Sequence, residues 1–132
     1  GLVQSITLDK KYRGKRIRLS VSIKTDSVED WGGAWARINN KGQRQYRPTS
    51  TMQKYNRNGS NSDGTFDNMG DRPISGTTDW QRYALVLQAG KNAQTMSFGI
   101  ALKGAGKMWF DELEIEVVEN NVPLTGVYKQ PI

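Results

Sequence analysis

The sequence contains no cysteine and no histidine among its 132 residues. Without cysteine, a disulfide framework, a thiolate metal site and a cysteine nucleophile are all excluded. Without histidine, the chain lacks the commonest general base, the commonest metal ligand and every Ser–His or Cys–His nucleophile pair. Because no other nucleophile motif is present, the composition argues against an enzyme, and we expect a non-catalytic protein.

Long apolar runs are also missing. No stretch approaches the roughly 20 apolar residues of a membrane helix, and no signal-peptide pattern is present, so we expect no membrane partner. The sequence opens with Gly1 rather than Met, which we interpret as a sign of processing or trimming. A hydrophobic content of 36% together with 14 glycines favours short strands with many turns.

The net charge of +6 is concentrated in one long polar segment. Residues 40–64 carry five basic residues and one acidic residue, a balance of +4, which leaves +2 for the rest of the chain. Such a composition is typical of a solvated surface loop. A loop that grips a ligand with Tyr46 and Tyr55 is the alternative. Nucleic acid is the minor hypothesis, because the predicted strands carry no continuous basic stripe.

Alternating apolar residues predict the strands. The clearest case is residues 15–24, KRIRLSVSIK, in which every second side chain is aliphatic and faces a core. Residues 25–30 read as a polar loop. Further strands are expected at residues 2–8, 34–39, 95–103 and 107–118, together with a short strand and a structured turn within 65–76 and a strand that follows Asp79. With about seven short strands and no helix, residues 1–132 are expected to form one all-β antiparallel sandwich of the jelly-roll type, with an irregular tail at 119–132.

Residues 95–118 are expected to form two strands joined by a glycine turn at residues 104–106. In the second strand the apolar parity changes between Phe110 and Leu113. The core face would therefore turn outward unless a β-bulge absorbs one residue. Asp111 lies at this slip, beside the indole of Trp109, and is the one local feature of the hairpin that could bind a ligand.

The run WQRYALVLQAG, followed by MSFGIALKGAGKMWFDELEIEVV, resembles the closing strands of carbohydrate-binding-module and galactose-binding-like jelly rolls. Four further segments, YRGKRIRLSVSIKT, WGGAWARIN, FDNMGDRPISGTTDWQRY and VVENNVPLTG, resemble a bacterial domain of unresolved function that occurs alone or attached to regulators. The matching segments run in order from Tyr12 to Gly126. The resemblance implies a fold and does not specify a ligand, because such jelly rolls bind glycans, other small molecules or proteins.

The resemblance implies two further features. One is a strand upstream of residues 4–6, which this chain starts too late to contain, so an edge strand is expected to be missing and a homodimer could fill the gap. The other is a structural calcium ion held in part by Asp111. Calcium takes roughly six to eight oxygen ligands, and the usual N-terminal carboxylate is absent. The other interpretation is a carboxylate that accepts backbone N–H bonds at the bulge.

Two aromatic–charged pairs form the expected ligand site. Trp35 and Arg37 share one strand face, and Trp109 and Asp111 share another. If both faces line one hollow, the indoles would stack on a sugar ring while the charged groups bind its hydroxyls. The alternative is that both tryptophans fill the core. Trp31 and Trp80, at strand entrances, are interpreted as packing residues.

Arg72 is the last residue of the expected ligand site. It belongs to the turn at residues 67–72, for which hydrogen bonds within the turn are the simpler interpretation. Glu112, Glu114 and Glu116 form a row that could be drawn as a paired-carboxylate glycosidase. A solvated face opposite Arg16 and Arg18 across the sheet is the better interpretation.

The sequence therefore predicts a non-catalytic module that binds a small polar ligand on its concave face, with a carbohydrate as the favoured class. The alternative is a structural, protein-interaction or sensor domain that self-associates through an exposed sheet edge.

Overall fold

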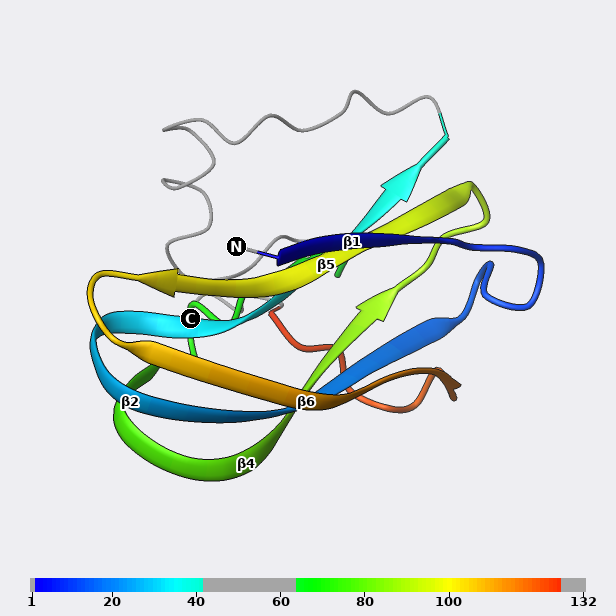
Figure 1. The fold of residues 1–132 in the computed structure, drawn as a ribbon. Helices are drawn as coiled ribbons and strands as arrows, with labels where there is room; N and C mark the ends of the chain where they lie inside the picture. Colours follow the sequence, from blue (N-terminus) through cyan, green and yellow to red (C-terminus); the bar gives the residue numbers. More distant parts are fainter. Residues whose placement is uncertain (1, 42–63, 127–132) are drawn as a thin grey trace, which may run out of the picture.

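The computed structural model describes residues 2–41 and 64–126, which form antiparallel strands and no helix (Figure 1). The strands are β1 (Leu2–Thr7), β2 (Arg16–Asn40), β3 (Phe66–Asp67), β4 (Ile74–Gln88), β5 (Ala93–Lys103) and β6 (Lys107–Val118). No helix in this part of the chain is long and apolar enough to cross a membrane. The all-β antiparallel prediction is confirmed for the described residues. Most of the predicted loop at 40–64 lies outside them.

The longest strand, β2, takes part in both halves of the sheet. Its first part, residues 16–26, pairs with β4 on one side and β6 on the other, and we call these strands the lower half (Figure 1). Its last part, residues 31–40, pairs with β5 and β3, and β5 pairs with β1. These strands are the upper half. Because β2 joins them, the strands form one open antiparallel sheet. The jelly-roll sandwich stays a prediction.

The polar loop predicted at residues 25–30 is wrong, since β2 continues through these residues. Thr25 is completely buried, and its hydroxyl donates a hydrogen bond to the carbonyl of Gly76 at 3.1 Å. Register shifts against β4 follow Thr25 and Val28, and Ser27 has a φ of 55°. Such shifts let a strand bend without losing its partners. Pairing with β4 therefore overrides the low strand propensity of these polar residues.

The core lies between the upper and lower halves. The alternating residues predicted at the start of β2 are all buried, and the buried residues of the upper half join them in a single cluster. From β2 and β4 this cluster contains Ile17, Leu19, Val21, Ile23, Ala34, Ala36, Ile38, Leu85 and Leu87, and from β5 Met96 and Phe98. One strand thus supplies apolar side chains to both walls of the same core.

The predicted β-bulge in β6 is confirmed. Ser20 of β2 faces Glu114, whereas Ser22 faces Asp111, so β6 has one more residue than β2 in this interval. Glu112 has a φ of 54°, a backbone conformation that non-glycine residues rarely adopt. Because the bulge absorbs the extra residue, the apolar residues on both sides of it keep the same inward parity.

The predicted glycine turn between β5 and β6 packs directly against the bend of β2. Gly106 has a φ of 133°, and a Cβ atom there would lie 2.6 Å from Val28 Cα and 2.8 Å from the Ser27 carbonyl oxygen. The amide of Glu29 donates a hydrogen bond to the carbonyl of Ala105 at 2.9 Å. Glycine is therefore required at position 106 both by its backbone conformation and by the close approach of β2.

The chain after β6 crosses to the edge of β4. Residues 119–126 contain no strand. The Val86 amide donates to the hydroxyl of Thr125 at 2.8 Å, and the Thr125 amide donates to the Val86 carbonyl at 3.0 Å. Leu124 lies so close to Gly64 that a Cβ atom on that glycine would be 2.7 Å from Leu124 Cδ1. The tail therefore covers part of the β4 edge.

Replacing Gly106 by alanine is expected to lower the free energy of unfolding by about 2–4 kcal/mol, because a strained φ and an overpacked contact add together. Urea unfolding monitored by tryptophan fluorescence measures the change. Gly90→Ala is the matched control, since a Cβ atom there would meet nothing within 4 Å and its φ is not positive. The control is expected to stay within about 0.5 kcal/mol of the starting protein. Equal midpoints for the two variants would contradict the packing of the turn on β2.

Candidate functional site

Trp35 lies on the outer face of the upper half. Its neighbours Ala34 and Ala36 are buried in the core, so the alternation of β2 turns the indole away from the core. Trp35 is half-buried and faces Gly99 of β5, which has no side chain. Part of the indole ring is therefore accessible, beside a position of β5 that has no side chain.

Polar side chains continue from Trp35 along the same face. Arg37 Nε donates to Asn39 Oδ1 at 3.0 Å, and Asn39 Nδ2 donates to Thr95 Oγ1 and Ser97 Oγ, each at 3.0 Å. The β2–β5 register sets Arg37 opposite Ser97 and Asn39 opposite Thr95. These four residues and Trp35 are the Trp35 strip. It combines an indole with amide and hydroxyl groups and one guanidinium.

Trp109 lies on the outer face of the lower half. The register of β6 sets it opposite Lys24, which follows the core residue Ile23. Trp109 is 43% exposed, and Lys24 Nζ lies 5.6 Å from the centroid of its ring. This distance is within the range of a cation–π interaction. A lysine therefore already occupies part of the space next to this indole.

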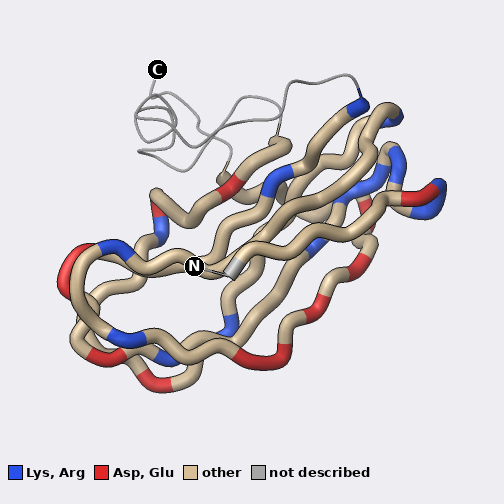
Figure 2. Tube along the Cα trace, turned by 45° about the horizontal axis from the view of Figure 1, so that its top comes forward, with Lys and Arg blue, Asp and Glu red and all other residues tan. Residues whose placement is uncertain are grey.

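The glutamates of β6 form cross-strand ion pairs on the same outer face. Arg18 of β2 contacts Glu116 at 2.7 Å, and Arg82 of β4 contacts Glu114 at 3.3 Å. Figure 2 shows acidic positions recurring along β6. The interpretation of this row as a solvated face is confirmed, with Arg18 as one predicted partner. The other partner is Arg82, because Arg16 donates instead to Gln88 Oε1 and to the Val122 carbonyl. The row does not have the apolar surroundings that a catalytic carboxyl requires.

Asp111 is exposed at the bulge of β6. Its Oδ1 accepts a hydrogen bond from the backbone amide of Glu112 at 2.8 Å, and its register partner is Ser22. In the part of the chain that the structure describes, no three His, Cys, Asp or Glu side chains gather in a way that could hold a metal ion. The local geometry thus supports the interpretation of a carboxylate that binds backbone at the bulge, and calcium binding by Asp111 stays a prediction.

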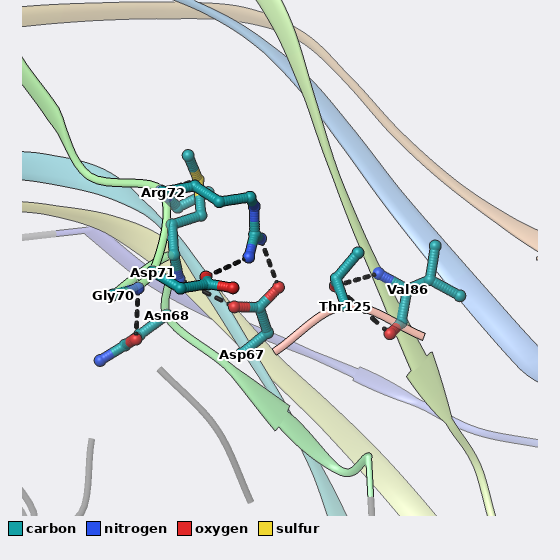
Figure 3. A network of polar contacts seen from close by, with 9 residues as sticks. Asp67, Asn68, Gly70, Asp71, Arg72, Val86 and Thr125 are labelled. Carbon is teal, nitrogen blue, oxygen red and sulfur yellow. Dashed lines mark hydrogen bonds and ion pairs between the residues drawn. The ribbon is translucent and has the colours of Figure 1, made fainter. Parts of the chain in front are cut away.

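Arg72 belongs to a closed hydrogen-bond network within its own turn (Figure 3). Its guanidinium contacts Asp67 Oδ2 and Asp71 Oδ1, both at 2.5 Å. The Asp67 carboxylate is completely buried, and its other oxygen accepts the Met69 amide at 2.8 Å. Asn68 accepts the amide of Gly70 in the same way. The interpretation of a structural turn is therefore supported, because both ends of the guanidinium already have partners within it.

The structure does not bring the five predicted ligand residues together. Trp35 and Arg37 lie on the outer face of the upper half, and Trp109 and Asp111 lie on the outer face of the lower half. Because the core separates the two halves, these outer faces look in opposite directions (Figure 1). Neither indole fills the core. Ligand binding by these residues stays a prediction, and it now concerns two separate faces.

Sequence reasoning missed three residues of the Trp35 strip, namely Asn39, Thr95 and Ser97. Their signal was present, because Thr95 and Ser97 alternate with the core residues Met96 and Phe98 and must therefore share the outer face. The β2–β5 register, which sets them beside Arg37 and Asn39, could not be read from the sequence.

Two aromatic residues of β4 lie outside the Trp35 strip. Trp80 is 46% exposed, more than expected for a packing residue. Partial burial raises the pKa of the Tyr83 hydroxyl above its ordinary value, because desolvation disfavours the charged form. The Tyr83 hydroxyl donates to Gln81 Oε1 at 3.2 Å. This contact is local to β4 and suggests no catalytic role.

No family model matches the chain, and no solved structure matches it significantly. Among curated proteins, it is similar to YbfP of Bacillus subtilis strain 168, described as an uncharacterised HTH-type transcriptional regulator, with 36% identity over 126 residues. The match covers 96% of this chain and 36% of the regulator, so the chain spans about a third of that relative's length. The chain is thus all-β in its described residues and related to part of an uncharacterised bacterial regulator.

Replacing Arg72 by methionine is expected to lower the free energy of unfolding by about 1–3 kcal/mol, because the buried Asp67 carboxylate loses a charged partner. Arg18→Met is the matched control, since it removes an arginine from an exposed pair with Glu116, and its cost is expected to stay below about 1 kcal/mol. Urea unfolding of both variants measures the difference. If both lose the same stability, the Asp67–Arg72 contact is no more important than a surface pair.

Proposed function

We propose that this chain is a non-catalytic ligand-sensing domain of a transcriptional regulator and that its ligand is a small neutral polar molecule, with a carbohydrate as the favoured class. The proposed binding site is the Trp35 strip. The single observation that carries the proposal is that the half-buried Trp35 shares one outer face with the hydrogen-bonded side chains of Arg37, Asn39, Thr95 and Ser97.

The similarity to a regulator supports a sensing role. An HTH-type protein reads the major groove with a helix, and the described residues of this chain form no helix. We therefore assign DNA reading to another part of such a regulator. A segment that binds a small molecule can bias the regulator between two states, provided that the ligand prefers one of them.

The chemistry of the Trp35 strip suits a sugar. The faces of a sugar ring carry C–H groups that pack on an indole, and its hydroxyls both donate and accept hydrogen bonds. Asn39 Nδ2 lies 3.0 Å from the hydroxyl oxygen of Thr95 and 3.0 Å from that of Ser97, so one amide and two hydroxyls gather on this outer surface. Three of the four polar side chains of the strip are uncharged, so a neutral ligand meets mostly neutral donors and acceptors.

The Trp109 face is the weaker candidate for this role. Lys24 lies over the indole, and the nearby glutamates are paired with Arg18 and Arg82. A neutral ligand would have to displace the lysine and would gain few uncharged partners. The relationship to jelly-roll modules stays a prediction.

Titration with a panel of neutral mono- and oligosaccharides, followed by tryptophan fluorescence, tests the proposal. We expect a saturable response with weak affinity, in the millimolar range, because ring stacking contributes little and the hydroxyls exchange bonds with water. Trp35→Ala is expected to abolish binding measured by calorimetry. The matched control, Trp109→Ala, removes an equally large ring from the other face and is expected to keep it.

Salt separates the proposed ligand from a polyanion. Sugar affinity should change little when ionic strength is raised, whereas a nucleic acid would lose affinity steeply. Two results would show that the Trp35 strip is not the sugar site. One is the absence of a fluorescence response to every sugar of the panel, and the other is loss of binding in Trp109→Ala while Trp35→Ala still binds.

A further inference from the structure

Strand β6 is an edge strand with one paired side. Among the described residues it pairs only with β2. The edge of β4, in contrast, is partly covered by the tail through Thr125 and Val86. On either side of the bulge at Glu112, the outer side of β6 presents backbone amides and carbonyls in the extended conformation that a further strand can pair with.

The inward face of β6 is apolar and remains half exposed. Phe110 and Val117 face the core side, opposite Ile23 and Ile17, yet they are 43% and 40% exposed, whereas their partners on β2 are 0% and 1% exposed. Leu113, on the same side, is 40% exposed. The core is therefore closed over β2 but not over β6. An additional strand beside β6 would cover these side chains.

The outward face of β6 is acidic. The strand carries one lysine against Asp111, Glu112, Glu114 and Glu116, in a chain whose net charge is +6. The Glu112 and Glu114 side chains are 72% and 67% exposed even though Arg82 contacts both. These carboxylates can therefore accept a second cation. Charged side chains and a bulge discourage pairing with a strand of like charge, whereas the apolar row beneath these carboxylates stays uncovered for a strand that carries cations.

We infer that the free edge of β6 binds an extended peptide segment of another protein, in which apolar residues alternate with lysine or arginine. Such a segment adds a strand to the sheet, with its apolar side chains over Phe110, Leu113 and Val117 and its cations beside the glutamates. A second copy of this chain fits less well. Antiparallel pairing of two β6 strands would set glutamates of one copy against glutamates of the other, and like charges in cross-strand positions destabilise a sheet.

A fluorescently labelled peptide of about ten residues, alternating valine and lysine, tests this inference by anisotropy. We expect saturable binding that weakens when salt is raised, together with protection of β6 amides from hydrogen exchange. Two peptides of matched length serve as controls. One has a central proline, which removes a ladder hydrogen bond, and the other has glutamate in place of lysine. Both are expected to bind at least about tenfold more weakly.

Variants of the protein locate the bound peptide. Leu113→Lys and Glu114→Lys are each expected to weaken binding about tenfold, since one places a charge among the inward residues and the other reverses an outward charge. Val3→Lys is the matched control, because Val3 is 63% exposed on another edge strand, β1. It is expected to leave affinity unchanged. Thermal unfolding verifies that each variant is folded.

Three results would overturn the inference. They are equal binding of all three peptides, equal affinity of Leu113→Lys and Val3→Lys, and a dimer in sedimentation equilibrium whose β6 amides are protected without peptide. The last result would assign the edge to a second copy. Sugar titration tests the Trp35 strip, which lies on the upper half of the sheet, whereas peptide binding tests β6 in the lower half. Failure of the sugar proposal is therefore distinguishable from failure of the peptide inference.

Discussion

Both halves of the sheet depend on β2, because this one strand is hydrogen-bonded to β3, β4, β5 and β6. A flat strand of 25 residues could not supply both walls of a core. The register shifts after Thr25 and Val28 bend it, and the glycine turn of the β5–β6 hairpin packs against that bend at Val28. Local backbone geometry at a few residues therefore decides that the upper and lower halves face each other.

The bend also determines which surfaces can share a function. An alternating strand has two faces, and once it is bent around a core the two outer faces point away from each other. Trp35 and Trp109 are both on outer faces, yet Trp35 lies in the last part of β2, in the upper half, and Trp109 lies in β6, in the lower half. The protein therefore has two chemically distinct surfaces. The outer face of the upper half is rich in neutral hydrogen-bonding groups, and the outer face of the lower half carries several ion pairs.

Local patterns were predictable from the sequence wherever they follow from side-chain period. The buried row of Ile17 and its alternating successors, the glycine turn and the β6 bulge all have this origin. The stretch from Thr25 to Asp30 was misread as a loop, because its polar residues become strand only through tertiary pairing with β4 and β6. The site was less predictable, since the Trp35 strip depends on which residues of β5 lie opposite β2.

The distribution of charge limits what can pair with the sheet. Although the chain has an excess of basic residues, four carboxylates lie on one edge strand, β6. Arg18 and Arg82 form ion pairs with these carboxylates but leave them partly exposed. Such exposed pairs contribute little stability, so stability alone does not account for four carboxylates in β6. Their effect on association is larger, because an acidic edge repels its own copy and attracts a basic strand. The apolar row on the inner side of β6 favours the addition of any strand with apolar side chains. The acidic row on the outer side favours a strand that also carries lysine or arginine.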